Sequence, residues 1–187
     1  LMLGRASDPS GLDYWSNKLT NKSATGISVA YWFVNSDEFQ NKNCSNEEYV
    51  TYMYNAFFGR RPDAAGLSDW VSQLDNGATR EHVFSGFTNS AEFAALCDSY
   101  GVIRGDYIEG VDWEKTAKVN LFVDRLYSSI LDRRCDTTGM TDWTVKLIRR
   151  EVTGAQVAYG FVFSQEFTTR HVANSDYVDV LYQAFMG

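Results

Sequence analysis

Apolar side chains recur with the period of an α-helix in three stretches of the chain, and polar side chains fill the positions between them. From Tyr49 they fall at i, i+3, i+4, i+7 and i+8, which places them on one helical face. The three faces carry Tyr49, Tyr52, Met53, Ala56 and Phe57; Val119, Phe122, Val123, Leu126 and Ile130; and Tyr177, Val180, Leu181, Ala184 and Phe185. Each stretch is predicted to be an amphipathic helix.

A motif of the form Gly-Arg-x-x-Asp-x-x-Gly-x-x-x-Trp occurs three times, with Asp132 in place of the first glycine in the last copy. Its copies lie 55 and then 73 residues apart and keep register at every position. The recurring residues are Arg5, Asp8, Gly11 and Trp15; Arg60, Asp63, Gly66 and Trp70; and Arg133, Asp136, Gly139 and Trp143. Self-similarity at fixed spacing is the signature of a repeat protein.

A second block, Ser-x-Glu-Phe, follows each motif and contains Glu38, Glu92 or Glu166. The motif aspartates and the block serines are placed to be helix N-caps, and Thr153 with Gln156 has the spacing of a capping box. The motif glycines would let a helix start approach a neighbour closely. No segment alternates with period two, so we predict an all-α fold of tandem helical repeats in a compact array, about four helices per unit.

The motifs also predict how the chain is divided into repeats. In a repeat protein, each unit buries its apolar face against its neighbours. The helix at 172–187 is therefore expected to dock on a neighbouring unit, and the chain is expected to be a piece of a longer protein. The expected segments are a first repeat without its opening helix at 1–43, a second repeat at 44–98, a linker at 99–118, a third repeat at 119–171, and the opening helix of a further repeat at 172–187.

Charge and hydropathy exclude some function classes. The chain has 17 basic and 24 acidic side chains, a net charge of −7, and no long cluster of lysine and arginine. A nucleic-acid-binding protein normally has a basic face, and an anionic membrane attracts basic segments. No apolar run reaches the ~20 residues of a membrane span. We therefore expect neither nucleic-acid binding nor membrane insertion.

The Gly-Arg motif followed by the Ser-x-Glu-Phe block resembles the bacterial family called domain of unknown function 4214. The stretches 96–105 and 159–164 are similar to versions from gut-dwelling Firmicutes. The resemblance implies tandem copies within a large secreted or surface-attached protein, and hence an extracellular or cell-surface location. The helical pattern is more remotely similar to phycobilisome linker domains, which are assembly modules. Two departures are Asp132 and Trp32, the latter standing where the other copies have Gly86 and Gly160.

The recurring arginine, aspartate and glutamate side chains admit two interpretations. They could be carboxylate pairs for acid–base chemistry or calcium binding, or each arginine could join the helix cap to the glutamate of the last helix. Repetition in every copy favours the structural interpretation. An acidic stretch with Asp106, Glu109, Asp112 and Glu114 is the nearest thing to a calcium loop, and we interpret it as a solvated linker.

Nucleophile and metal motifs are absent from the sequence. His82 and His171 stand at unmatched repeat positions and have no zinc spacing. Cys44, Cys97 and Cys135 allow one disulfide, with Cys44–Cys97 conceivable, or three free thiols. No Gly-x-Ser-x-Gly, phosphate loop or dinucleotide fingerprint occurs. We expect no catalytic residue, no metal and no cofactor.

Aromatic side chains outside the motifs are the candidates for recognition, because flat rings stack on sugars and anchor protein interfaces. The candidates are Trp113, Tyr100, Tyr107, Trp32 and Tyr14, and the alternative for each is ordinary helix packing. The expected function is a non-catalytic binding, adhesion or spacer module with a glycan or host protein as partner. The alternatives are a purely structural assembly module and an accessory domain of a glycan-active enzyme.

Overall fold

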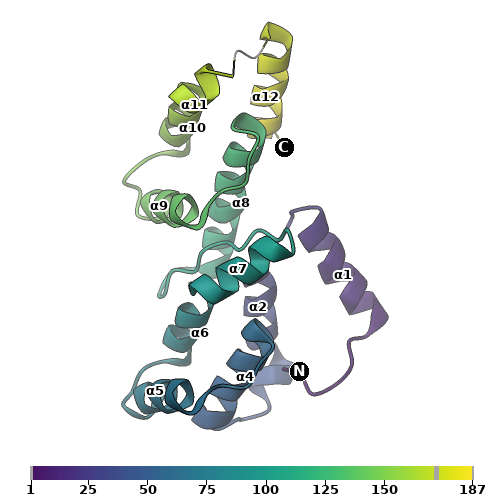
Figure 1. The fold of residues 1–187 in the computed structure, drawn as a ribbon, viewed down its shortest axis with the longest axis vertical. Coiled ribbons are helices and arrows are strands. Elements are labelled where there is room, and N and C mark those ends of the chain that lie inside the picture. The colour runs from purple at the N-terminus through teal and green to yellow at the C-terminus, as the bar shows by residue number, and fades with distance from the viewer. Residues whose placement is uncertain (1, 171–172, 187) are drawn as a thin grey trace. The chain divides into compact units, whose positions relative to one another are not determined.

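The structure, a computed structural model, describes residues 2–170 and 173–186, and all regular secondary structure in these residues is helical (Figure 1). The helices are α1 (Pro9–Thr20), α2 (Gly26–Val34), α3 (Asp37–Gln40), α4 (Asn46–Phe58), α5 (Ala64–Asp75), α6 (Arg80–Thr88), α7 (Ala91–Ser99), α8 (Trp113–Ile130), α9 (Thr137–Ile148), α10 (Gly154–Val162), α11 (Gln165–Thr168) and α12 (Asn174–Met186). The prediction of an all-α fold built from tandem helical repeats is confirmed.

The chain divides into two compact units, Leu1–Gly110 and Val111–Gly187. The first unit contains α1–α3, the body of the first repeat, followed by the complete second repeat, α4–α7. The second unit contains the complete third repeat, α8–α11, followed by α12. The order of helices in a complete repeat is therefore one long opening helix and a body of three shorter helices.

Side-chain caps begin the helices of each repeat body, as the sequence predicts. The carboxylates of Asp8, Asp63 and Asp136 accept hydrogen bonds from the backbone amides of Gly11, Gly66 and Gly139 at 2.7, 2.9 and 2.8 Å. Ser36, Ser90 and Ser164 cap the last helix of each body, and Thr153 with Gln156 forms the predicted capping box. These caps satisfy amides that a helix N-terminus leaves without an intrahelical partner.

Helix α4 packs between the first repeat and its own body. Near its N-terminus Tyr49 lies against Phe39 of α3, with ring centroids 6.3 Å apart. Near its C-terminus Phe57 contacts Phe84 of α6 and Phe93 of α7, with ring centroids 5.8 and 5.0 Å apart. The opening helix is thus the element that joins one repeat to the next within the first unit.

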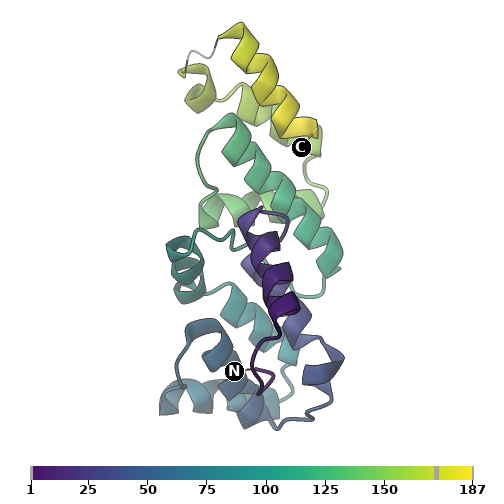
Figure 2. The ribbon, with the colours of Figure 1, turned by 90° about the vertical axis from the view of Figure 1, so that its right-hand side faces the viewer.

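Helices α8 and α12 reproduce parts of this arrangement in the second unit. Tyr127 of α8 lies edge-on against Phe161 of α10, with centroids 4.8 Å apart. Tyr177 of α12 lies 5.9 Å from Phe167 of α11, which repeats the contact of Tyr49 with Phe39. Helix α12 also packs against α8 (Figure 2). The third repeat therefore receives α12 as the first repeat receives α4.

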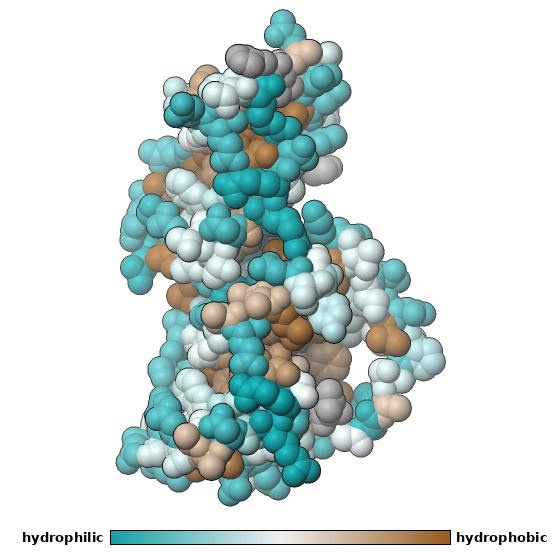
Figure 3. Space-filling view, viewed as in Figure 1, coloured by the Kyte–Doolittle hydropathy of each residue, from teal (hydrophilic) through white to brown (hydrophobic). Residues whose placement is uncertain are grey.

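Within the described residues the first repeat begins with its body, and α1 buries no side chain. Leu12 is 54% exposed, whereas Met140 at the same motif position in α9 is only 4% exposed. Figure 3 shows exposed hydrophobic atoms on the first unit beside α1. Position 32 is also packed differently from its counterpart in the second repeat, Gly86. A Cβ added at Gly86 would meet the ring of Trp70 at 2.4 Å, so that position has no room for a side chain. In the first repeat the large side chain of Trp32 is exposed on α2.

The expectation of a solvated linker at 99–118 is wrong for the middle of that segment. Ile103 and Arg104 are buried, and their carbonyls accept hydrogen bonds from the first amides of α2, those of Gly26 and Ile27. The buried Arg104 guanidinium pairs with Asp106 at 3.2 Å. Helix α8 begins already at Trp113. This segment holds the two repeats of the first unit together, through contacts that the repeat pattern does not contain.

The backbone also explains the Asp132 departure. Gly4 and Gly59 have φ angles of 75° and 64°, and Asp132 adopts 55° at the same motif position. Aspartate is one of the few residues with a side chain that tolerates this left-handed region. The third copy of the motif therefore keeps the left-handed turn with aspartate in place of glycine.

Two glycines of the third repeat make a matched test of close packing. A Cβ on Gly139 would meet the Tyr127 hydroxyl at 2.2 Å, whereas a Cβ on the helical Gly160 meets nothing within 4 Å. We expect Gly139→Ala to destabilise the protein by about 1–3 kcal/mol through overpacking. We expect Gly160→Ala to stabilise it by about 0.5–1 kcal/mol, because alanine loses less conformational entropy in a helix.

Denaturant unfolding followed by circular dichroism measures both changes. Unchanged stability in Gly139→Ala would contradict the close approach of the Tyr127 hydroxyl to Gly139. A loss of stability in Gly160→Ala would contradict the open surroundings of Gly160.

Candidate functional site

Each repeat contains one arginine that binds a glutamate of the last helix through two hydrogen bonds. Arg5 donates to Glu38 at 2.7 and 2.9 Å, Arg60 to Glu92 at 3.0 and 2.9 Å, and Arg133 to Glu166 at 2.6 and 3.2 Å. The arginine lies in the turn before the second helix of the repeat, and the glutamate lies in the first turn of the last helix. The ion pair therefore joins the two ends of the repeat body.

The motif aspartates lie farther from the arginines and serve mainly as caps. The Arg–Asp separations are 3.7, 3.9 and 3.5 Å in the three copies. The hydrogen bond from the Gly139 amide holds the pKa of Asp136 below its usual value, and the Arg133 guanidinium does the same for the pKa of Glu166. Both carboxyls stay ionised at neutral pH, and their charges are already paired. This geometry favours the structural interpretation over acid–base chemistry.

A tyrosine of the opening helix completes the arrangement in the second and third repeats. The Arg60 guanidinium lies 5.1 Å from the centroid of the Tyr54 ring, and that of Arg133 lies 4.8 Å from the Tyr127 ring. The tyrosine hydroxyl occupies the space beside Gly66 or Gly139 that a Cβ would fill. Burial raises the pKa of both tyrosines. This tyrosine is not among the candidates predicted from the sequence, although Tyr54, Tyr127 and Tyr182 stand at the same repeat position.

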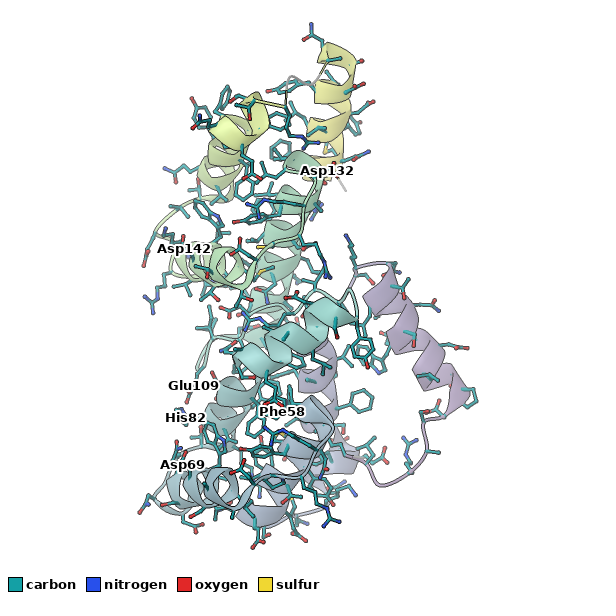
Figure 4. All side chains as sticks on the ribbon, viewed as in Figure 1. Phe58, Asp69, His82, Glu109, Asp132 and Asp142 are labelled. Atoms are coloured by element: carbon teal, nitrogen blue, oxygen red, sulfur yellow. The ribbon has the colours of Figure 1, made fainter. Side chains whose placement is uncertain are left out.

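The residues considered for metal binding have other partners. Within residues 2–170 and 173–186, no three His, Cys, Asp or Glu side chains are grouped so that they could hold a metal ion. Glu109 lies 3.1 Å from His82 (Figure 4), and Asp112 caps α8. His171 lies outside the described residues. The acidic stretch before α8 is thus used in contacts within the fold.

The cysteines show no bridge between Cys44 and Cys97, since Cys44 is a free thiol. Cys44 is buried and accepts a long hydrogen bond from Arg80 at 3.7 Å. Burial raises the pKa of the Cys135 thiol to about 12. At neutral pH this thiol is protonated, and a protonated thiol is a poor nucleophile.

Two of the five aromatic candidates for recognition lie in the core. Trp113 is buried at the start of α8, and Tyr107 is buried against Phe84 with ring centroids 4.9 Å apart. The Tyr107 hydroxyl donates to Glu81 at 2.8 Å. The expectation that these two rings offer a binding surface is wrong, and the alternative of helix packing applies to them. Tyr100, Trp32 and Tyr14 are exposed and remain candidates.

The structure adds a pair of aromatic rings that sequence reasoning missed. Tyr159 on the outer face of α10 is 66% exposed, and Phe163, the C-cap residue of this helix, is 60% exposed. Their ring centroids are 4.4 Å apart with an interplanar angle of 36°. In the sequence, the pair could have been recognised from its i, i+4 spacing, which puts both rings on one side of the helix. The buried side chains of Val157 and Phe161 lie on the opposite side.

Each copy has a capped three-helix body and an arginine that binds the glutamate of the last helix, a pair that we call the staple. Together with the repeated opening helices, these features define a tandem helical-repeat protein. The family described as "Domain of unknown function (DUF4214)" matches residues 1–43, 30–97 and 113–171, so the chain belongs to this family in tandem copies. Neither a curated protein nor a solved structure matches the chain. No helix in the described residues is long and apolar enough to cross a membrane.

The lowered carboxyl pKa values predict how acid affects stability. The unfolded chain takes up protons near the ordinary carboxyl pKa values of about 3.9–4.3, and the folded chain takes them up only at lower pH. The stabilisation by the ionised carboxylates is therefore complete above these values and is lost as the pH falls through the lowered ones. Arg133→Ala removes the main cause of the Glu166 shift, so we expect a shallower acid-induced fall of the melting temperature.

Melting curves over an acidic pH series test this expectation. The control is Arg149→Ala, which removes an exposed arginine from the same unit and should keep the parent's pH profile. An identical profile for Arg133→Ala and the parent would rule out the staple as the source of the pH dependence.

Proposed function

We propose that this chain is a non-catalytic interaction module of a secreted or surface-attached bacterial protein. Its exposed aromatic side chains would bind a glycan or a host protein. The observation that carries this proposal is the Tyr159–Phe163 pair, two neighbouring rings exposed at the C-terminal end of α10. A folded protein gains stability by burying such rings, so a pair left in solvent points to a partner.

The recurring polar side chains support the absence of catalysis. A catalytic carboxylate pair needs members whose pKa values are driven apart, so that one is a proton donor and the other an acceptor. Here the pKa values of Glu38, Glu92 and Glu166 are all lowered by the arginines that bind them. Side chains used in the same way in every copy suit a fold staple better than an active site.

The location and the partner class belong to the same proposal. The resemblance to the domain family implies tandem copies within a secreted or surface-attached protein, which supports an extracellular location. The net charge of −7 suits a chain that remains soluble there. The repeated staples also suit a structural spacer, which is the second candidate function. An accessory domain of a glycan-active enzyme would use the same aromatic surface.

The double variant Tyr159→Ala/Phe163→Ala tests the aromatic pair. Both rings are exposed, so the fold should tolerate their removal, while a binding hot spot loses at least about 2 kcal/mol, or more than tenfold in affinity. Binding is measured on a glycan array and by capture of proteins from host secretions. The matched control is Leu96→Ala, which shortens an exposed apolar side chain of the other unit. A further variant, Tyr100→Ala, removes a candidate ring from that unit.

Glycan hits or a captured protein that are lost in the double variant and kept in the control would support the proposal. No binding in either assay would favour the spacer function. Loss of binding in Tyr100→Ala alone would place the recognition surface on the first unit.

A further inference from the structure

The turn between α5 and α6 contains the only Asn-Gly dipeptide of the chain, Asn76-Gly77. Asn76 is the C-cap residue of α5, with φ and ψ of −88° and 9°, and Gly77 follows it with a φ of 98°. Both residues are exposed, and a Cβ added at Gly77 would meet nothing within 4 Å. A side-chain amide and the backbone nitrogen after it therefore lie together in an open turn.

The same turn occurs in the other two repeats with different residues. In the first repeat the C-cap residue of α1 is Asn21, at −84° and 7°, and Lys22 follows it with a φ of 58°. In the third repeat Arg149 and Arg150 take these places, and Arg150 has a φ of 60°. The backbone is thus shared by all three copies, and glycine follows asparagine only in the second.

Two hydrogen bonds hold the Asn76-Gly77 turn closed. The Asn76 side-chain amide donates to the Ser72 carbonyl at 2.7 Å, and the Gly77 amide donates to the Leu74 carbonyl at 3.1 Å. Both belong to the last turn of a helix, where fraying is common and local opening costs little free energy. Once the turn opens, Gly77 has no Cβ to obstruct approach to its nitrogen, whereas Lys22 has one.

We propose that Asn76 is a site of non-enzymatic deamidation, with water as the co-reactant. The Gly77 amide loses its proton to solvent base, and its nitrogen attacks Cγ of Asn76. A new C–N bond closes a five-membered succinimide, while the bond from Cγ to Nδ2 breaks and the leaving nitrogen takes up a proton to depart as ammonia. Water then opens the succinimide at either carbonyl and leaves an aspartate or an isoaspartate at position 76. No atom is oxidised or reduced.

The modification destabilises the end of α5. The product carries a carboxylate at the C-terminal end of the helix dipole, where negative charge is unfavourable, and it no longer donates to Ser72. An isoaspartate also adds a methylene group to the main chain within this turn. The neighbouring residue, Asp75, joins α5 to α4 by accepting a hydrogen bond from Asn46 at 2.7 Å. We therefore expect the modified chain to melt at a lower temperature.

Incubation of the full 187-residue chain in warm, mildly alkaline buffer tests the proposal. Proteolytic peptide mapping by mass spectrometry follows, at each asparagine, the mass change from amide to carboxyl, and an isoaspartate assay follows the second product. The expected result is conversion of Asn76 several-fold faster than that of Asn21. Asn21 is the matched control, since it has the same backbone geometry and an exposed side chain in the same chain.

Two variants separate the chemistry from the fold. Gly77→Lys copies the first repeat and should fold, because Lys22 and Arg150 adopt the same left-handed backbone, and it should slow Asn76 to the rate of Asn21. Asn76→Asp reproduces one product and should lower the melting temperature. Equal rates at Asn76 and Asn21, or an unchanged rate in Gly77→Lys, would overturn the proposal. Conversion of Asn76 in urea but not in the folded chain would overturn it as well.

Discussion

A tyrosine hydroxyl that lies beside a glycine organises the second and third repeats. Gly66 and Gly139 stand in the first turn of α5 and α9, and any larger residue would occupy the place of Tyr54 or Tyr127. The close approach of the tyrosine hydroxyl to the glycine fixes where the opening helix crosses the body of its repeat. It also brings the tyrosine ring beneath the staple arginine, so that one guanidinium binds a carboxylate along its edge and an aromatic ring on its face.

This geometry explains why the motif residues recur together. The aspartate caps the helix through the amide of the same glycine that admits the tyrosine. The arginine binds the glutamate in all three copies, and in the second and third copies it also lies over the tyrosine ring. The ion pairs are about half exposed, and such pairs contribute little free energy in water. Their main role is geometric, while burial of Phe57, Phe87 and their counterparts supplies most of the stability.

The sequence predicted the features that depend on local chemistry or on repetition. Caps such as Asp63 and Ser90 follow from a side chain and an amide three residues away, so position alone identifies them. Trp113 and Tyr107 were misassigned because they do not recur. Tyr107 is buried through its contacts with Phe84 and Glu81, which lie far from it in the sequence. The segment around Arg104 was misread for a similar reason, since a buried ion pair looks like a polar linker in a sequence.

Repetition also carries information about faces that are left uncovered. In a single chain an exposed tyrosine such as Tyr182 or an exposed leucine such as Leu12 would be unremarkable, because many apolar atoms of any protein face solvent. Here the same positions are buried in other copies, so comparison between the repeats shows which contacts cover each face in a complete repeat.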